Sequence, residues 1–190
     1  MNEQYMAARA LPIVVAGDPV ERLASLFDVH HDRLYRLARR LAPSADDALD
    51  LVQETFLKAA RFPKSIPIGA RNEEAWLVRV LINIRRDQWR KTSVRDRYDK
   101  AAFGGGNLAS DGRSPEAELI ARTAVWQALN VLPPRRRAIV VMYELEGLAI
   151  PAIASLLGIS AITVRWHLSM GRRNLARALK DHMGGTHEKY

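Results

Sequence analysis

The chain contains no cysteine among its 190 residues, which excludes disulfides and thiolate metal sites. Its N-terminal part has one short apolar run, LPIVVAG, which lacks a basic leader and is too short to span a bilayer. Strict apolar–polar alternation is nearly absent, whereas helical spacing of apolar residues recurs along the whole chain. We therefore expect an all-α protein that is soluble and cytoplasmic.

Catalytic motifs are also missing. The sequence has no glycine-rich phosphate loop, no HExxH motif and no paired catalytic constellation. His30 and His31 are adjacent, and adjacent helical residues diverge by about 100°. We expect both to be partly exposed structural residues. The sequence predicts a non-catalytic protein without a cofactor or a metal site.

Acidic residues are outnumbered and unevenly distributed. The chain has 29 Lys and Arg against 21 Asp and Glu, a formal net charge of +8. Such an excess indicates a nucleic-acid partner or an anionic membrane. From Gly147 to Lys180 there is no acidic residue, but there are four arginines and a lysine. This one-sided charge is what binding to a phosphate backbone requires.

Capping and breaking signals divide the chain into two helical units. Segment 61–72 holds two prolines and a glycine and is expected to be a loop, and the helix after it is expected to run to about Lys91. We expect caps, in chain order, at Asp18, Ser44, Asn72, Ser114 and Ser160. The expected divisions are a flexible N-terminal segment (1–17), a first domain (18–91), a flexible linker with a glycine triplet (92–114), a second domain (115–180) and a tail (181–190).

The stretch LLGISAITVRWHL, residues 156–168, is typical of a helix-turn-helix. One helix ends at Gly158 and Ser160 caps the next. The packing stripe of that last helix is expected to comprise Val164, Leu168, Gly171, Leu175 and Ala178, with Gly171 allowing close helix contact. Trp166 points away from this stripe. Two explanations compete: it contacts a thymine methyl or sugar edge in the major groove, or it is covered by a protein partner or the other domain. We expect both roles, with DNA contacted in the active protein and a protein partner in the silent one.

Two other helical faces carry polar patterns. A basic face with an asparagine follows the spacing i, i+4, i+7, i+11 at Arg79, Asn83, Arg86 and Arg90, opposite the apolar Leu77, Val80, Leu81 and Ile84. Such a face can hold a phosphate backbone and a base edge, or it can be an ordinary solvated face. An acidic and apolar patch comprises Asp50, Gln53, Glu54 and Leu57. The patch suits a basic protein partner, although an ordinary amphipathic helix has the same pattern.

In sequence order, these elements resemble a known family. The segments RLYRLARRLAPSADDALDLVQETFLKAARF and AWLVRVLINIRRDQWRK resemble domain 2 of the bacterial RNA polymerase sigma factors of the sigma-70 family. The segment LNVLPPRRRAIVVMYELEGLAIPAIASLLGISAITVRWHLSMGRRNL resembles sigma domain 4. The combination is similar to the small extracytoplasmic-function (ECF) group, over roughly 21–92 and 115–180. The family usually has a small polar residue where Trp166 stands.

The resemblance implies a sigma factor that binds core RNA polymerase, recognises the −35 and −10 promoter elements, melts the promoter and initiates transcription. The acidic and apolar patch would dock on the polymerase clamp helices, and residues 115–146 would rest on the flap. An anti-sigma factor would be a further partner. The −35 contacts would come from Thr163, Arg165, Trp166, Ser169, Arg172 and Arg173. The −10 contacts and melting would come from loop 61–72 with Arg79, Asn83, Arg86 and Arg90.

The alternative is a stand-alone helix-turn-helix transcriptional regulator. Such a protein would use its N-terminal half as a sensor or dimerisation domain, with a ligand pocket or a phosphoacceptor site. Here the N-terminal half instead carries its own candidate nucleic-acid face and a candidate partner patch. Two DNA-binding faces on one small chain favour a subunit that bridges two promoter elements.

Overall fold

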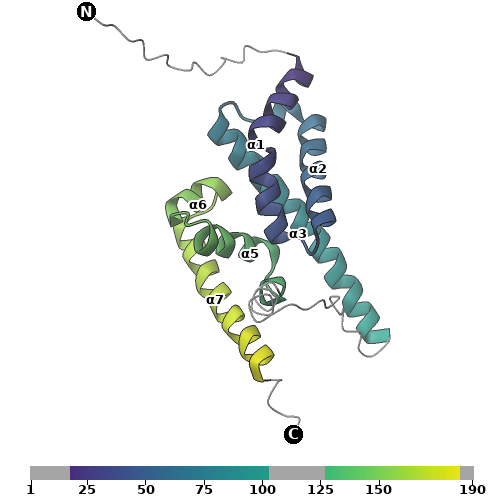
Figure 1. Ribbon diagram of the computed structural model, residues 1–190, viewed down its shortest axis with the longest axis vertical. Helices are drawn as coiled ribbons and strands as arrows, with labels where there is room; N and C mark the ends of the chain where they lie inside the picture. The colour runs from purple at the N-terminus through teal and green to yellow at the C-terminus, as the bar shows by residue number, and fades with distance from the viewer. Residues whose placement is uncertain (1–17, 103–126, 185–190) are drawn as a thin grey trace, which may run out of the picture.

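The computed structural model describes residues 18–102 and 127–184, with side chains over 18–92 and 127–180 (Figure 1). All the regular elements in these ranges are helical, which confirms the all-α prediction. The first unit contains α1 (Pro19–Leu41), α2 (Ala45–Arg61), the short 3₁₀-helix η1 (Pro63–Ser65) and α3 (Ala70–Ala102). The second contains α5 (Pro134–Val140), which continues into the π-helix η2 (Val141–Leu145), then α6 (Ile150–Leu157) and α7 (Ala161–Gly184).

Side-chain caps begin three of the helices where the sequence predicts them. An Asp18 carboxylate oxygen accepts from the Val20 N–H at 3.1 Å, and the Ser44 hydroxyl accepts from the Asp47 N–H at 3.1 Å. The Ser160 hydroxyl accepts from the Thr163 N–H at 3.1 Å and begins α7. Gly158 ends α6 with a φ of 64°, a left-handed conformation that favours glycine. The predicted helix-turn-helix is therefore confirmed.

The bounds of α3 differ from the prediction at both ends. The helix begins at Ala70, so Asn72 lies in the first turn instead of capping it, and its side-chain amide donates to the Ile68 carbonyl at 3.1 Å. The predicted loop 61–72 is thus shorter, because Arg61 still belongs to α2. At the other end α3 continues to Ala102, past Lys91 and into the predicted linker. Residues 92–102 contain neither proline nor glycine, so no residue type there ends the helix.

Several predicted segments fall outside the described residues. They are the N-terminal segment 1–17, residues 103–114 of the linker with its glycine triplet, the Ser114 cap with most of the helix expected after it, and the end of the tail. Of the helix expected after Ser114, residues 127–130 are described, and they are helical.

The core of the first unit lies where α1, α2 and α3 meet. Leu34, Leu37, Leu51, Leu77 and Leu81 are completely buried there. The predicted apolar side of α3 is confirmed, and two further residues of that helix, Val78 and Ile82, are buried as well. The reason is that α3 packs against α1 and α2 and also contacts α5 and α6 of the second unit (Figure 1).

In the second unit α7 packs closely on α5. Val164 and Leu168 of the predicted stripe are buried, together with Ile139 and Ile153. A Cβ atom on Gly171 would stand 2.5 Å from Cγ2 of Val140. The absence of a side chain at Gly171 is therefore what lets the two helices approach, as the sequence predicted.

The two helices of the helix-turn-helix are apolar, so their ability to cross a membrane can be judged from their length and composition. No single helix in the described ranges is long and apolar enough to cross a bilayer. Helices α6 and α7 pass such a test by length and composition only as a pair, and they are bent by 107° relative to each other.

Candidate functional site

Helix α7 exposes most of the residues predicted to contact the −35 element. Arg165, Trp166, Ser169, Arg172 and Arg173 are all exposed on it. Thr163, by contrast, is partly buried, and its hydroxyl lies 2.8 Å from the Ser160 hydroxyl within the N-terminal cap. All six predicted residues thus lie on α7, where five are exposed and Thr163 is partly buried in the first turn.

The arginines on α7 differ in their partners. Arg172 pairs with Glu144 of η2 at 2.8 Å, and its guanidinium lies 5.5 Å from the centre of the Tyr143 ring. The hydrogen bond to Glu144 raises the pKa of Arg172. Arg173 reaches the Met170 sulfur at 3.0 Å on its own helix. Arg165 makes no hydrogen bond or ion pair with the described residues, so its charge is free for a ligand.

Trp166 stands out from α7 but is held on two sides. The residue is 53% exposed. The Arg136 guanidinium of α5 lies 5.4 Å from the centre of its ring. The His167 ring packs edge-on against it with the two ring centres 4.9 Å apart. Burial, followed by the charges of Arg136 and Arg135, lowers the pKa of His167, so its neutral form is favoured.

The four residues of the predicted melting face on α3 differ in how accessible they are. Asn83 and Arg90 are exposed, and Arg86 is partly exposed with its Nε 3.5 Å from the Asp87 carboxylate. Arg79 lies against the turn of the helix-turn-helix, where its Nη1 would be 3.1 Å from a Cβ on Gly158. Three of the four side chains therefore remain accessible, while Arg79 is engaged with the second unit.

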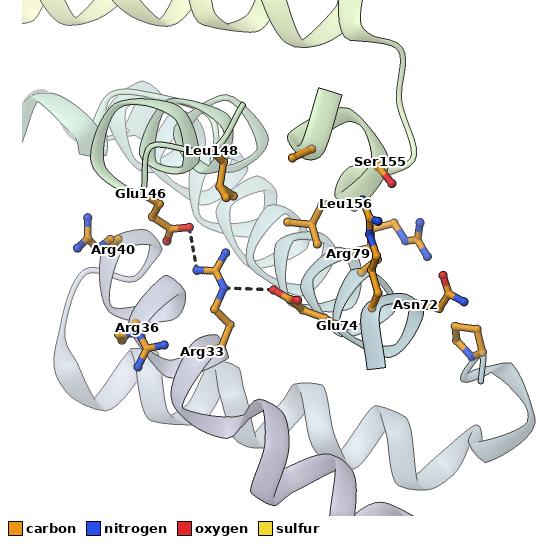
Figure 2. Close-up of a pocket in the computed structure, with 14 residues that line it drawn as sticks. Arg33, Arg36, Arg40, Asn72, Glu74, Arg79, Glu146, Leu148, Ser155 and Leu156 are labelled. Atoms are coloured by element: carbon orange, nitrogen blue, oxygen red, sulfur yellow. Dashed lines mark hydrogen bonds and ion pairs between the residues drawn. The ribbon is translucent and has the colours of Figure 1, made fainter. Parts of the chain in front are cut away.

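An arginine-lined cavity between the two units is the main feature that the sequence did not predict. It is open to solvent on one side and has a volume of about 620 Å³, and Figure 2 shows side chains from α1, α3 and the second unit around it. Arg33 bridges the units by pairing with Glu74 at 3.2 Å and with Glu146 at 2.8 Å. Arg36 and Arg40 line the cavity too. The spacing of these arginines along α1 was the available signal.

Two arginines lie where the units meet, Arg85 half-buried and Arg137 buried. The Arg85 Nε donates to the Leu41 carbonyl at 3.0 Å, and burial lowers its pKa. Arg137 is 3% exposed and donates to the Asn130 side chain. Burial, followed by the charge of Arg85, lowers the pKa of Arg137 to about 10. The contact between the units thus places two like charges close together.

His30 departs from its predicted environment. It is 5% exposed instead of partly exposed, and its Nε2 lies 3.9 Å from the Glu73 carboxylate at the start of α3. It shares a face of α1 with the buried Leu34, and that face packs toward α3. His31 is partly exposed, as predicted.

The acidic and apolar patch on α2 points to solvent along its full length. Its four residues, Asp50, Gln53, Glu54 and Leu57, are all exposed. Leu57 is 57% exposed although it is a large apolar side chain. Gln88 of α3 donates to the Glu54 carboxylate at 3.3 Å and steadies that end of the patch. The opposite face of α2 is buried, so the patch is a one-sided surface.

These features define a class of protein: a two-unit, all-helical chain whose second unit is a helix-turn-helix with an exposed basic helix. Two family models match the chain. One is Sigma-70 region 2, over residues 26–95, and the other is Sigma-70 region 4, over residues 122–175. The chain belongs to the sigma-70 family, and relatives at 32–33% identity over 90% or more of its length place it among the ECF RNA polymerase sigma factors.

Relatives with the same description match most of the chain. The ECF RNA polymerase sigma factor SigM of Mycobacterium tuberculosis is 33% identical over 172 residues, which are 90% of this chain and 84% of SigM. SigW of Bacillus subtilis is 27% identical over 94% of this chain and 99% of its own length. SigE of Mycolicibacterium smegmatis is 36% identical over 83% of this chain, which spans 61% of SigE.

Solved structures share the fold. The sigma factor RpoE of Bartonella quintana, in complex with the anti-sigma factor NepR, superposes with a TM-score of 0.55 at 24% identity, covering 85% of this chain and 96% of RpoE. CnrH, in complex with the cytosolic domain of CnrY, superposes with a TM-score of 0.56 at 23% identity, covering 87% and 92%.

Proposed function

We propose that this sigma factor divides its work among three surfaces: α7 reads the −35 element, α3 contacts and melts the −10 element, and the α2 patch docks on core polymerase. The observation that carries the proposal is the charge of α7. Five predicted contact residues are exposed on it, and no acidic side chain lies between Gly147 and Lys180 to repel DNA. Since Arg165 has no hydrogen-bond or ion-pair partner among the described residues, its guanidinium is the one best placed to donate two hydrogen bonds to a guanine edge.

The −10 role requires a change in the arrangement of the two units. Arg79 contacts Gly158, so it is engaged by the second unit in this conformation. The ion pair between Arg33 and Glu146 holds the same contact closed. Asn83, Arg86 and Arg90 can meet DNA first. We infer that Arg79 joins them when the units separate on polymerase.

The docking role follows from the chemistry of the α2 patch. An exposed leucine beside two carboxylates fits a partner that offers basic groups around an apolar centre. The clamp helices of polymerase are the proposed partner. Residues 127–146 belong to the segment proposed to rest on the flap. The chain acts in the cytoplasm as a non-catalytic subunit.

An anti-sigma factor is the proposed inhibitory partner. RpoE and CnrH share the fold of this chain, and RpoE was solved with the anti-sigma factor NepR and CnrH with the cytosolic domain of CnrY. The exposed apolar residues Ile162 and Trp166 on α7 offer such a partner a surface on the helix that is also proposed to bind DNA.

In vitro transcription with purified core polymerase tests the whole proposal. With the chain added, transcripts should start at defined sites. Arg165→Ala should lower −35-dependent initiation by roughly 5- to 150-fold, in line with the loss of about 1–3 kcal/mol for a bidentate base contact. Arg177→Ala, an exposed arginine farther along α7, is the matched control for lost charge. Nanomolar binding of the free chain to a single duplex site, without polymerase, would instead establish a stand-alone regulator.

A further inference from the structure

Arg136 is placed to control how Trp166 is presented on α7. The two residues come from different helices, and the guanidinium of Arg136 lies 5.4 Å from the centre of the indole ring. At that distance a guanidinium is attracted to the face of an indole. With His167 against another part of the ring, the indole is fixed on the helix while about half of its surface stays open to solvent.

The surrounding residues hold Arg136 in turn. Its stem crosses α7 at Gly171, where a Cβ would stand 3.5 Å from its Cγ. The side-chain amide of Asn174 has one orientation in which both its oxygen and its nitrogen form hydrogen bonds. In that orientation the oxygen accepts from the Arg136 Nη1 at 3.0 Å and the nitrogen donates to the Met170 carbonyl at 3.2 Å. No described acidic side chain pairs with Arg136. The guanidinium of Arg136 is thus committed to α7 twice, through its Nη1 to Asn174 and through its charge to the Trp166 ring.

We propose that Arg136 is a specificity-determining positioning residue for the −35 element, and that it acts by holding Trp166 against the methyl group of a thymine in the major groove. This inference rests on the proposed reading of the −35 element by α7. Thymine is the base that presents an apolar group in that groove, so it is the base that an exposed indole matches. Because an exposed tryptophan side chain can adopt several rotamers, holding Trp166 in one of them improves discrimination by removing an ordering cost on binding.

The experiment removes the methyl group and nothing else. A randomised −35 library is selected with the reconstituted polymerase holoenzyme, and the selected promoter is resynthesised with each thymine replaced in turn by deoxyuridine. The wild-type holoenzyme should bind the thymine form about fourfold more tightly than the deoxyuridine form at one position, the equivalent of one buried methyl group. Trp166→Ser and Arg136→Met should reduce that ratio to about one, and Arg136→Lys should leave an intermediate ratio because it retains the cation.

Two further variants make the result specific to Arg136. Arg135→Met removes the neighbouring charge from the same helix and should keep the full ratio. Asn174→Ala leaves Arg136 and Trp166 intact but removes the oxygen that fixes the guanidinium, and should lower the ratio. It is the deciding variant if Arg136→Met does not fold. The inference is overturned if no deoxyuridine weakens wild-type binding, or if the ratio stays at its full value in folded Arg136→Met or in Asn174→Ala. A library that yields no preferred −35 sequence would instead refute the proposed function of α7.

Discussion

Replacing Gly171 by alanine tests how tightly α7 packs on α5. Gly171 is buried between α7 and α5, and an added Cβ would stand 2.5 Å from Cγ2 of Val140. Val140 is 3% exposed and branched at Cβ, so it has no room to swing away. Either the two helices must move apart, or the valine must adopt a strained rotamer.

The expected magnitude is a balance of two terms. Alanine in place of glycine favours a helix by about 1 kcal/mol. Forcing an extra carbon into a filled core costs about 1–3 kcal/mol. Because the clash involves a short buried side chain, the second term should exceed the first, and Gly171→Ala should destabilise the second unit by about 1 kcal/mol.

The sign of the effect should reverse when the obstacle is removed. Val140→Ala deletes Cγ2 and should itself cost about 1.5 kcal/mol, since two buried methyl groups are lost. In that background the added Cβ of Gly171→Ala finds space. The substitution should then stabilise the unit by about 1 kcal/mol, the helix-propensity term alone.

Hydrogen exchange measures this in the intact chain. Peptides from α5 and α7 report the local free energy of opening for the second unit, while peptides from α2 serve as the internal control. The four proteins of the cycle are wild type, the two single variants and the double variant. If Gly171→Ala has the same sign and size in both backgrounds, the close approach at Val140 does not limit this position and the argument fails.

Three further predictions concern polymerase, DNA and pH. Asp50→Lys with Glu54→Lys should weaken pull-down of core polymerase while leaving α-helical circular dichroism unchanged, and normal pull-down would remove the docking role from α2. Asn83→Ala should shift preference at one −10 base, whereas Arg86→Ala should reduce the salt dependence of binding by about one phosphate contact and reduce permanganate reactivity of the −10 region. Burial and nearby arginines lower the pKa of His167 in the folded protein. Near the usual histidine pKa of about 6.5, the unfolded chain therefore binds a proton at His167 more readily than the folded chain does. Stability should therefore fall as the pH drops through that value, and urea titrations of His167→Gln should show a flatter dependence in this range.

The residue order alone predicted the features that depend on near neighbours in the chain. Caps such as Ser44 and Ser160 act over three residues, and a left-handed end such as Gly158 depends on its own backbone, so both can be recognised without knowing the fold. The periodicity of apolar residues likewise identified the buried side of α3 and of α7. The motifs of the two units, in their order, indicated the sigma-70 family. The assignment of individual residues to promoter or polymerase contacts stays a prediction.

Tertiary structure decided which charged and aromatic side chains meet. Arg33 pairs with Glu146, Arg79 lies against Gly158 and the Arg136 guanidinium lies over the Trp166 ring, although each pair is far apart in sequence. No periodicity encodes such contacts, because a long side chain can reach several neighbours and its choice depends on how the helices pack. Helix packing also decides the environment of His30. The sequence predicted a partly exposed side chain, but the start of α3 packs against it and buries it. Local sequence sets the helices and their faces, and the packing of one unit on the other determines which of those faces are free for DNA.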